Sequence, residues 1–263
     1  MVDGSGLEPP LAPDTVRLMC DRRTGIGADG IIVMLQSIDR DIRMRVLNAD
    51  GGEAEMCGNG IRALFLFAID KGAAGGSRIE VETGAGTRVV RSLGERDGQK
   101  LFSVDMGNPA YRFSDIPMDG PPEEEALGVS ISLDDGTRVE ATCVSFGNPH
   151  CVIFVDNLEG FPVARIGPML ENHDIFPQRT NVEFVEVGGR TRLSARVWER
   201  GVGETLACGT GACASLVAAR LNGLCESKAT VSVPGGVLEV AWERDAVTLT
   251  GPARHVFDGR TAD

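Results

Sequence analysis

The chain has 263 residues, of which 42% are hydrophobic and 24% charged, a composition typical of globular proteins and sufficient for one large or two medium domains. Its 38 acidic and 26 basic side chains give a formal net charge of −12, which argues against non-specific binding to nucleic acid or to anionic membranes. No run of 18 apolar residues occurs, and the first residues are neither basic nor apolar enough for a signal peptide. We therefore expect a cytoplasmic protein that is not associated with a membrane.

The cysteines and histidines show no metal-binding or disulfide pattern. Seven cysteines, an odd number, include no Cys-x-x-Cys pair, and the three histidines are far apart in the sequence. We expect neither a disulfide framework nor a metal site. Five cysteines are predicted to be small buried apolar residues, namely Cys20, Cys143, Cys151, Cys213 and Cys225.

The first informative pattern along the chain is residues 48–60, NADGGEAEMCGNG. The apolar run that follows ends at Lys71-Gly72, so we predict a helix that begins at Cys57 and ends there. Free N–H groups at a helix start favour a thiolate, so we expect a lowered pKa for Cys57 and for Cys208, which opens the second copy of this pattern. Two strands, Arg78–Thr83 and 87–91, are predicted to follow as a hairpin.

The middle of the chain contains a connection and an interrupted strand. Residues 101–106 are predicted to be the last strand of a first half, and the Pro-, Asp- and Glu-rich residues 113–128 to connect the halves. Strand-like residues 142–146 and 151–155 flank a Gly-Asn-Pro-His turn. Two interpretations of His150 remain open: it accepts a proton from a thiol, or it closes this turn. Residues 179–184 predict another strand, with Asn181 near its start.

Residues 199–211, ERGVGETLACGTG, repeat the first pattern 151 positions further on. Cys208 aligns with Cys57, a second apolar run ends at Asn222-Gly223, and strands are predicted at 230–233 and 237–242. Glu53 and Glu204 also align, and we expect both to cap helix starts. A duplication explains this agreement better than two independent helix–hairpin patterns.

The repeat predicts an α/β (α+β) fold of two pseudo-symmetric domains, each a curved, mostly antiparallel sheet wrapped around a central helix. We expect the first domain to contain residues 1–109 and 252–263, and the second residues 110–251. A thiol at each helix start, facing the other across a shared cleft, would provide the two groups that two-base proton transfer requires.

The two cysteine motifs resemble the paired signatures of the diaminopimelate epimerase family, as do residues 21–30, 147–150 and 179–182. The resemblance implies a cofactor-independent isomerase, likewise without a metal, and a homodimer. It implies that LL-2,6-diaminopimelate is converted to the meso form, a step toward lysine and peptidoglycan precursors.

Carried over residue by residue, the resemblance makes Cys57 and Cys208 the acid/base pair. His150 and Glu199 are the candidates for activating a thiol. Arg200 suits a distal carboxylate, and Glu199 suits a distal ammonium group. The implied substrate contacts are Asn48, Gly58, Asn59, Asn148, Asn181, Glu199, Arg200, Gly209 and Thr210.

Two features leave alternatives open. The family normally opens with a His-Gly-Leu-Gly-Asn-Asp-Phe-like motif, which the first 20 residues do not match, so we expect a weaker first half with an exposed sheet edge. A proline or hydroxyproline racemase also uses two cysteines for proton transfer, but it usually has histidine where this chain has Asn59. A degenerate non-catalytic paralogue is the third interpretation, and the presence of both cysteines weighs against it.

Overall fold

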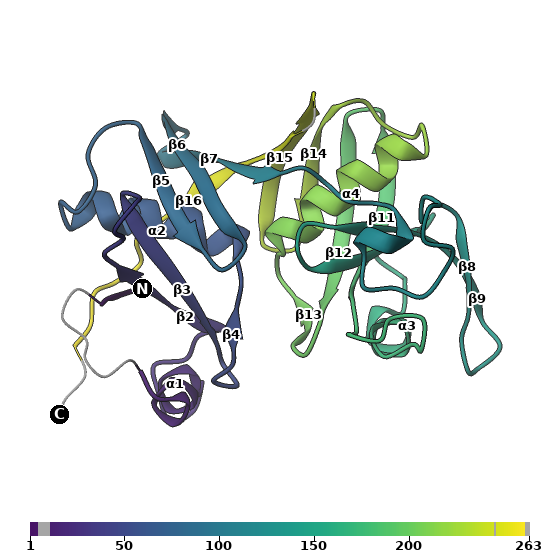
Figure 1. The fold of residues 1–263 in the computed structure, drawn as a ribbon, viewed down its shortest axis with the longest axis horizontal. Helices are drawn as coiled ribbons and strands as arrows, with labels where there is room; N and C mark the ends of the chain where they lie inside the picture. Colours follow the sequence, from purple (N-terminus) through teal and green to yellow (C-terminus); the bar gives the residue numbers. More distant parts are fainter. Residues whose placement is uncertain (5–10, 245, 261–263) are drawn as a thin grey trace. The chain divides into compact units, whose positions relative to one another are not determined.

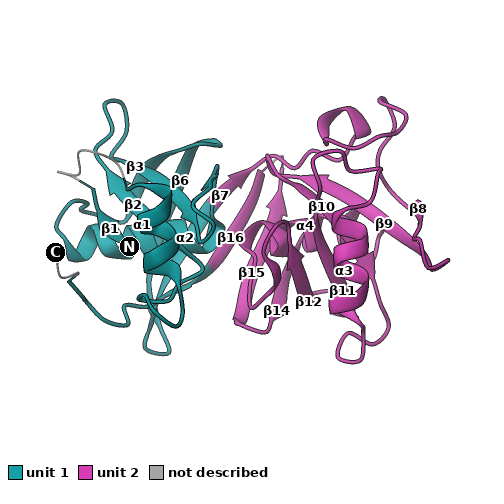
Figure 2. Ribbon diagram, turned by 90° about the horizontal axis from the view of Figure 1, so that it is seen from below, with its two compact units in different colours: residues 1–104, 251–263 teal, residues 105–250 magenta. Residues whose placement is uncertain are grey.

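A computed structural model describes residues 1–4, 11–244 and 246–260. The chain forms two compact units, coloured separately in Figure 2. Unit 1 contains Met1–Val104 and Gly251–Asp263, and unit 2 contains Asp105–Thr250. The chain passes from one unit to the other inside two strands, β7 (Gln99–Gly107) and β16 (Ala246–Ala253).

Unit 1 is a mostly antiparallel sheet with helix α2 packed on it (Figure 1). Its strands run in the order β1-β2-β3-β5-β6-β7, with β4 paired to β3. The β1–β2 and β3–β5 pairs are parallel, and the other pairs are antiparallel. Before β7 the elements are β1 (Val2–Asp3), α1 (Pro13–Cys20), β2 (Gly30–Leu35), β3 (Ile42–Asn48), β4 (Glu53–Ala54), α2 (Gly58–Asp70), β5 (Arg78–Thr83) and β6 (Gly86–Arg96).

Unit 2 has the same plan, with strand order β16-β15-β14-β12-β11-β10-β9-β8 and β13 paired to β12. Helix α4 contacts strands from β9 to β15, so the sheet encloses it. The elements are η1 (Phe113–Asp115), β8 (Val129–Ser132), β9 (Arg138–Ser145), β10 (Pro149–Phe154), α3 (Val163–Glu171), β11 (Asn181–Gly189), β12 (Arg192–Glu199), β13 (Gly203–Thr205), α4 (Gly209–Leu221), β14 (Lys228–Val233) and β15 (Gly236–Glu243).

The duplication extends to the strand register. Val46 pairs with Ala54 in unit 1, and 151 positions later Val197 pairs with Thr205 in unit 2. The parallel pairs β3–β5 and β12–β14 correspond as well, with Ile42 paired to Val81 and Leu193 to Val231, although β14 follows β5 by 150 positions and not 151. The predicted fold class, two similar halves each built around one helix, is confirmed.

Both central helices are apolar because each is buried. Phe65 of α2 and Leu216 of α4 occupy equivalent positions, and both side chains are fully buried. In α4 every residue from Gly209 to Ala219 is buried, so this helix has no polar face. Each helix ends as predicted, because Gly72 and Gly223 have φ values of 70° and 71°, which glycine adopts without strain.

The structure differs from the sequence analysis in three places. Helix α1 was not predicted, although Pro13 lies at its start, a common helix signal. Residues 113–128 are not a free connection, since Phe113, Ile116 and Met118 are buried in the core of unit 2. The edge of β2 that we expected to be exposed pairs with Val2–Asp3 of β1.

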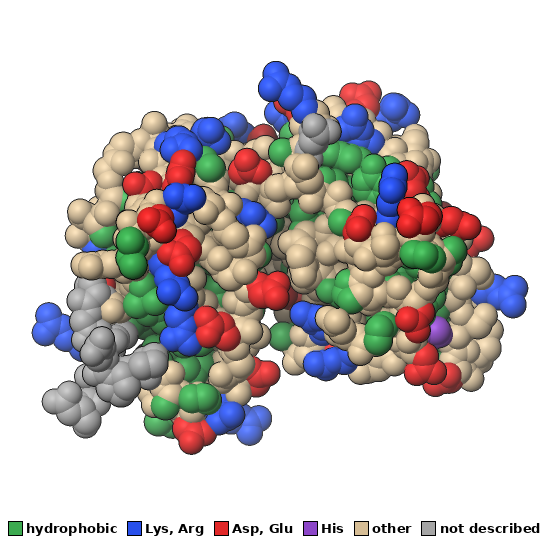
Figure 3. Space-filling model, viewed as in Figure 1, with side chains coloured by type: hydrophobic (Ala, Val, Ile, Leu, Met, Phe, Trp, Pro, Cys, Tyr) green, Lys and Arg blue, Asp and Glu red, His purple; other side chains and the backbone are tan. Residues whose placement is uncertain are grey.

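Charged side chains of both signs are interspersed over the face of each unit shown in Figure 3. On that face the described basic side chains do not gather into one patch. Among the described residues, no helix has both the length and the apolar character needed to cross a membrane. The five cysteines predicted to be buried apolar residues are indeed buried, at 0–4% exposure.

The burial of α4 predicts a strong packing effect. We expect Leu216→Ala to lower the free energy of unfolding by about 2–5 kcal/mol, because it leaves a cavity in a filled core. The control is Leu206→Ala, whose side chain is 71% exposed and whose loss should change stability by less than about 0.5 kcal/mol. Urea unfolding followed by circular dichroism measures both, and equal effects would contradict the enclosed position of α4.

Candidate active site

Each motif cysteine is the N-cap of the central helix of its unit. Gly60 N donates to Cys57 Sγ over 3.3 Å, and Gly211 N donates to Cys208 Sγ over 3.4 Å. A buried helix start leaves its first N–H groups without partners, and here a sulfur accepts one of them. The prediction that each cysteine begins a helix is confirmed.

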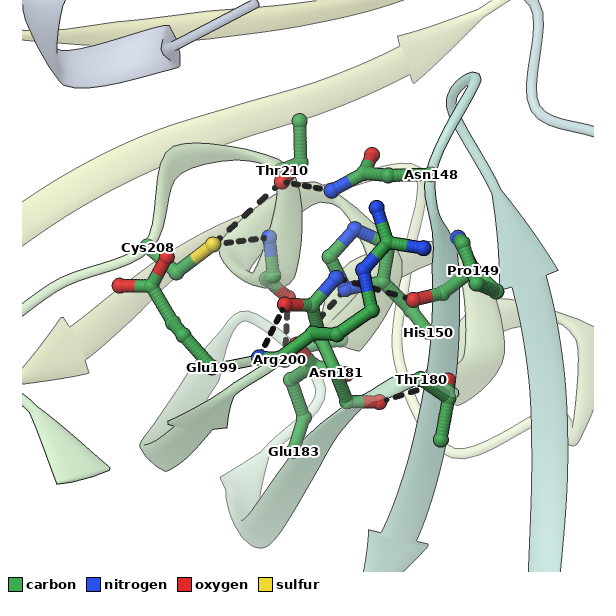
Figure 4. Close-up of polar contacts among 12 residues, drawn as sticks. Asn148, Pro149, His150, Thr180, Asn181, Glu183, Glu199, Arg200, Cys208 and Thr210 are labelled. Atoms are coloured by element: carbon green, nitrogen blue, oxygen red, sulfur yellow. Dashed lines mark hydrogen bonds and ion pairs between the residues drawn. The ribbon is translucent and has the colours of Figure 1, made fainter. Parts of the chain in front are cut away.

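Around Cys208, unit 2 forms a chain of polar contacts (Figure 4). Thr210 Oγ1 lies 3.4 Å from Cys208 Sγ and accepts a hydrogen bond of 3.3 Å from Asn148 Nδ2. That bond leaves the hydroxyl proton of Thr210 available to the sulfur. Gly209, at the first position of α4, is buried. The structure thus connects three of the predicted site residues, one of which comes from the Gly-Asn-Pro turn.

The electrostatics of Cys208 correct the expectation of a lowered pKa. Burial raises the pKa of this thiol well above its ordinary value, and the carboxylates of Glu199 and Glu183 raise it further. The hydrogen bonds from Thr210 and Gly211 act in the opposite direction and are outweighed. Cys208 is therefore held as a protonated thiol at neutral pH, despite its place at a helix start.

Glu199 is the last residue of β12, beside Cys208 in Figure 4. Thr205 Oγ1 donates to its carboxylate. Burial raises the pKa of Glu199, and the hydrogen bond from Thr205 partly offsets that effect. The nearby Glu183 raises the pKa as well. A carboxyl group so placed exchanges a proton more readily near neutral pH than an exposed glutamate does.

Asn181 joins two backbone segments of the site. Its Oδ1 accepts from the Arg200 amide over 3.0 Å, and its Nδ2 donates to the Pro149 carbonyl over 3.0 Å. The Arg200 guanidinium donates to the Gln178 carbonyl over 3.1 Å. Asn181, the first residue of β11 as predicted, therefore fixes the segments that carry Arg200 and His150 relative to each other.

A second buried carboxylate, Glu171, supports the turn after β12, and the sequence did not suggest it. It accepts from Trp198 Nε1 over 2.7 Å, from the Gly201 amide over 2.8 Å and from Arg179 over 3.2 Å. Arg179 has a φ of 59°, an uncommon value for a residue other than glycine. These bonds hold the turn that presents Glu199 and Arg200.

His150 forms a fully buried pair with Glu183, another residue that the sequence interpretation missed. His150 Nδ1 lies 2.7 Å from Glu183 Oε1, and both side chains have 0% exposure. The Gly-Asn-Pro turn is held instead by its backbone and by Ser145 Oγ, which accepts from Gly147 N. The sequence signal that could have found Glu183 is a glutamate inside the apolar strand segment VEFV, residues 182–185. Val182 and Phe184, on either side of it, are also fully buried.

The aligned glutamates are not helix caps. Glu53 on β4 pairs with Arg45 at 2.7 Å, and Glu204 on β13 pairs with Arg196 at the same distance. Both pairs cross from a short strand to the long strand beside it, at equivalent positions of the two units. These ion pairs hold β4 and β13, the short strands that lead to the two cysteines, against the long strands beside them. They do not cap the helix starts, which sulfur already caps.

The other predicted site residues belong to unit 1. Asn48 ends β3, and its turn is closed by the Gly51 amide, which donates to the Asn48 carbonyl over 2.9 Å. Gly58 and Asn59 open α2, where the buried Arg62 donates to the Gly58 carbonyl and to Asn59 Oδ1, both over 3.0 Å. In unit 1 the first turn of the helix is thus held by an arginine of the same helix.

Solved structures of other proteins have a similar fold. Among solved structures, a hydroxyproline epimerase from Agrobacterium vitis matches with a TM-score of 0.67 over 90% of this chain and 76% of the other, at 16% identity. A PhzF-family phenazine biosynthesis protein from Bacillus anthracis matches with a TM-score of 0.66 over 95% and 88%, at 17% identity. These likenesses define the class, a two-unit fold shared by an epimerase and PhzF-type proteins.

The sequence comparisons are more specific. A family model described as diaminopimelate epimerase matches residues 1–112 and 142–256. A diaminopimelate epimerase of Desulfitobacterium hafniense is 46% identical over 259 residues, 97% of this chain and 90% of the relative. One from Synechococcus elongatus is 50% identical over 260 residues, 96% of this chain and 89% of the relative. The chain belongs to the diaminopimelate epimerase family.

The raised pKa of Cys208 predicts slow reaction with alkylating agents. We expect Glu199→Gln to lower the pKa of Cys208, because removing a nearby negative charge favours the thiolate. Alkylation of Cys208 by iodoacetamide, followed by peptide mass spectrometry across pH, should then reach half of its maximal rate at a lower pH. Glu204→Gln, which removes a carboxylate paired with Arg196, is the control. An unchanged profile in Glu199→Gln would refute the electrostatic account.

Proposed function

We propose that this protein converts LL-2,6-diaminopimelate to meso-diaminopimelate by cofactor-independent proton transfer. The observation that carries the proposal is the pair of cysteines, Cys57 and Cys208, each capping a buried helix at equivalent positions. Relatives at 46–50% identity, which cover most of the chain, are named diaminopimelate epimerase. The reaction belongs to the formation of lysine and peptidoglycan precursors.

In the proposed mechanism, one cysteine as thiolate removes the α-proton and the other as thiol returns a proton to the opposite face. Each direction of the reaction needs one sulfur in each state. The raised pKa of Cys208 suits it to start as the proton donor. The N–H groups at the starts of α2 and α4 suit a substrate carboxylate that gains negative charge as the α-proton leaves.

The remaining contacts recognise a substrate with two amino-acid ends. Arg200 suits the distal carboxylate, since a guanidinium binds a carboxylate with two parallel hydrogen bonds. Glu199, Asn148 and Asn181 suit the ammonium groups and neighbouring atoms, and Asn48 and Asn59 are the matching polar residues of unit 1. Glu171, which supports the turn of Arg200, acts as a positioning residue.

The alternatives are less well supported. A racemase for proline or hydroxyproline has the same fold, but the hydroxyproline epimerase that matches is 16% identical. A non-catalytic paralogue would have no reason to keep both cysteines with their capping bonds. Following the family resemblance, we further propose that the protein acts in the cytoplasm as a homodimer without pyridoxal phosphate, and sedimentation equilibrium tests the dimer.

Single replacement of either cysteine tests the mechanism directly. We expect Cys57→Ala and Cys208→Ala each to lower epimerisation of LL-diaminopimelate by at least about 100-fold, because one of the two proton-transfer groups is lost. Circular dichroism detects the product, and mass spectrometry in deuterated water detects exchange of the α-proton. Cys213→Ala, a buried cysteine of α4, is the control. Full activity in either single variant would exclude two-cysteine catalysis.

A shared site also predicts a specific disulfide. Mild oxidation with diamide should link Cys57 to Cys208 and abolish activity, and a reductant should restore it. Peptide mapping without reduction identifies the link. Substrate present during oxidation should slow the reaction, since it separates the sulfurs. Loss of activity with the link between other cysteines would count against a shared site.

A further inference from the structure

The buried pair of His150 and Glu183 is more than a packing feature. Both side chains are fully buried, and one bond of 2.7 Å joins His150 Nδ1 to Glu183 Oε1. The second nitrogen, Nε2, and the second oxygen, Oε2, are buried and have no hydrogen-bond partner. A buried polar atom without a partner is costly, so a fold that keeps two of them in one pair suggests a functional use.

Glu183 has no acidic counterpart in unit 1. The residue 151 positions before Glu183 is Ile32, and both lie against the glycine three residues after the helix-capping cysteine. A Cβ on Gly211 would come within 2.6 Å of Glu183 Oε1, and one on Gly60 within 2.0 Å of Ile32 Cδ1. The same space beneath the helix start therefore holds a carboxylate in one unit and a hydrocarbon in the other.

The chemistry of the pair fixes which histidine nitrogen is exchangeable. An ionised carboxylate only accepts hydrogen bonds, so Nδ1 carries a proton whether the ring is neutral or charged. Nε2 is then the nitrogen that gains or loses a proton. Because the ring is enclosed and anchored at Nδ1, its orientation is fixed.

We propose that Glu183 is a positioning residue of the proposed epimerisation, which acts by holding His150 as the Nδ1–H form with Nε2 free to exchange a proton in the site. This inference rests on the proposed function. Glu183 touches no reacting atom in this role, and His150 carries the proton. Because unit 1 has Ile32 at the position of Glu183, this arrangement belongs to the unit that contains Cys208.

Three other titratable groups surround the pair. Glu199 at the end of β12 interacts electrostatically with both members, and Cys208 at the start of α4 interacts with Glu183. Cys151, which follows His150 on β10, also interacts with Glu183, and its contact with Cys143 and its burial raise its pKa well above the ordinary value. Cys151 therefore stays neutral and adds no charge beside the pair.

Glu183→Gln tests the proposal, because glutamine keeps the shape and an accepting oxygen but removes the charge. We expect kcat/KM to fall by about tenfold or more, since orientation and charge both support proton transfer. We also expect His150 to be held less strictly in the Nδ1–H tautomer, because the glutamine amide can donate as well as accept a hydrogen bond. The matched control is Glu186→Gln on the same strand, where the half-buried carboxylate accepts from the Leu158 amide.

Nitrogen NMR of the three histidines measures the tautomer of His150 directly, without an assay of activity. In the wild-type protein, long-range ¹H–¹⁵N correlations should show the Nδ1–H tautomer for His150. A wild-type His150 in the Nε2–H tautomer would overturn the proposal, even if Glu183→Gln fails to fold. So would a Glu183→Gln variant with the same kcat/KM and the same His150 tautomer as Glu186→Gln. If the wild-type protein does not epimerise LL-diaminopimelate, the proposed function fails, and the NMR tautomer still decides whether Glu183 fixes the ring.

Discussion

The need to satisfy the first amides of a buried helix constrains the whole structure. In each unit one helix packs on the sheet, and the first N–H groups of that helix need partners wherever the packing keeps water away. Sulfur is a weak acceptor, yet Cys57 and Cys208 fill this place in both units. Under the proposed function, the fold and the chemistry therefore depend on the same two residues.

The two units keep this framework and differ in what surrounds it. The pairing of each short strand with its long neighbour and the ion pairs of Arg45 with Glu53 and Arg196 with Glu204 repeat at one offset of 151 positions. At the helix starts, however, Asn59 aligns with Thr210 and Ile32 with Glu183. The chemistry of the two halves is thus not equivalent. An epimerase removes a proton from one face of a carbon and returns a proton to the opposite face. The different residues around Cys57 and Cys208 suit these two different tasks.

Much of the fold could be predicted because its signals are local. The Cys-Gly-x-Gly starts, the apolar runs and the closing glycines mark both central helices, and alternating strands mark both hairpins. The hydrogen bonds of Glu171 and Glu183 join residues distant in sequence, so only the spatial arrangement reveals them. The pKa of Cys208 was predicted with the wrong sign for the same reason. The helix start is visible in the sequence, whereas burial and two acidic neighbours are not.

The acidic surroundings of Cys208 suggest how the free and bound states differ under the proposed function. Glu183 and Glu199 disfavour a third negative charge beside them, so the thiolate of Cys208 is costly while the site holds no cation. A diaminopimelate molecule carries two ammonium groups, and one bound beside Glu199 offsets that carboxylate. Binding then lowers the pKa of Cys208 toward the range in which the thiol gives up a proton. Glu199, which suits an ammonium group of the substrate, thus also helps to keep Cys208 protonated until the substrate is bound.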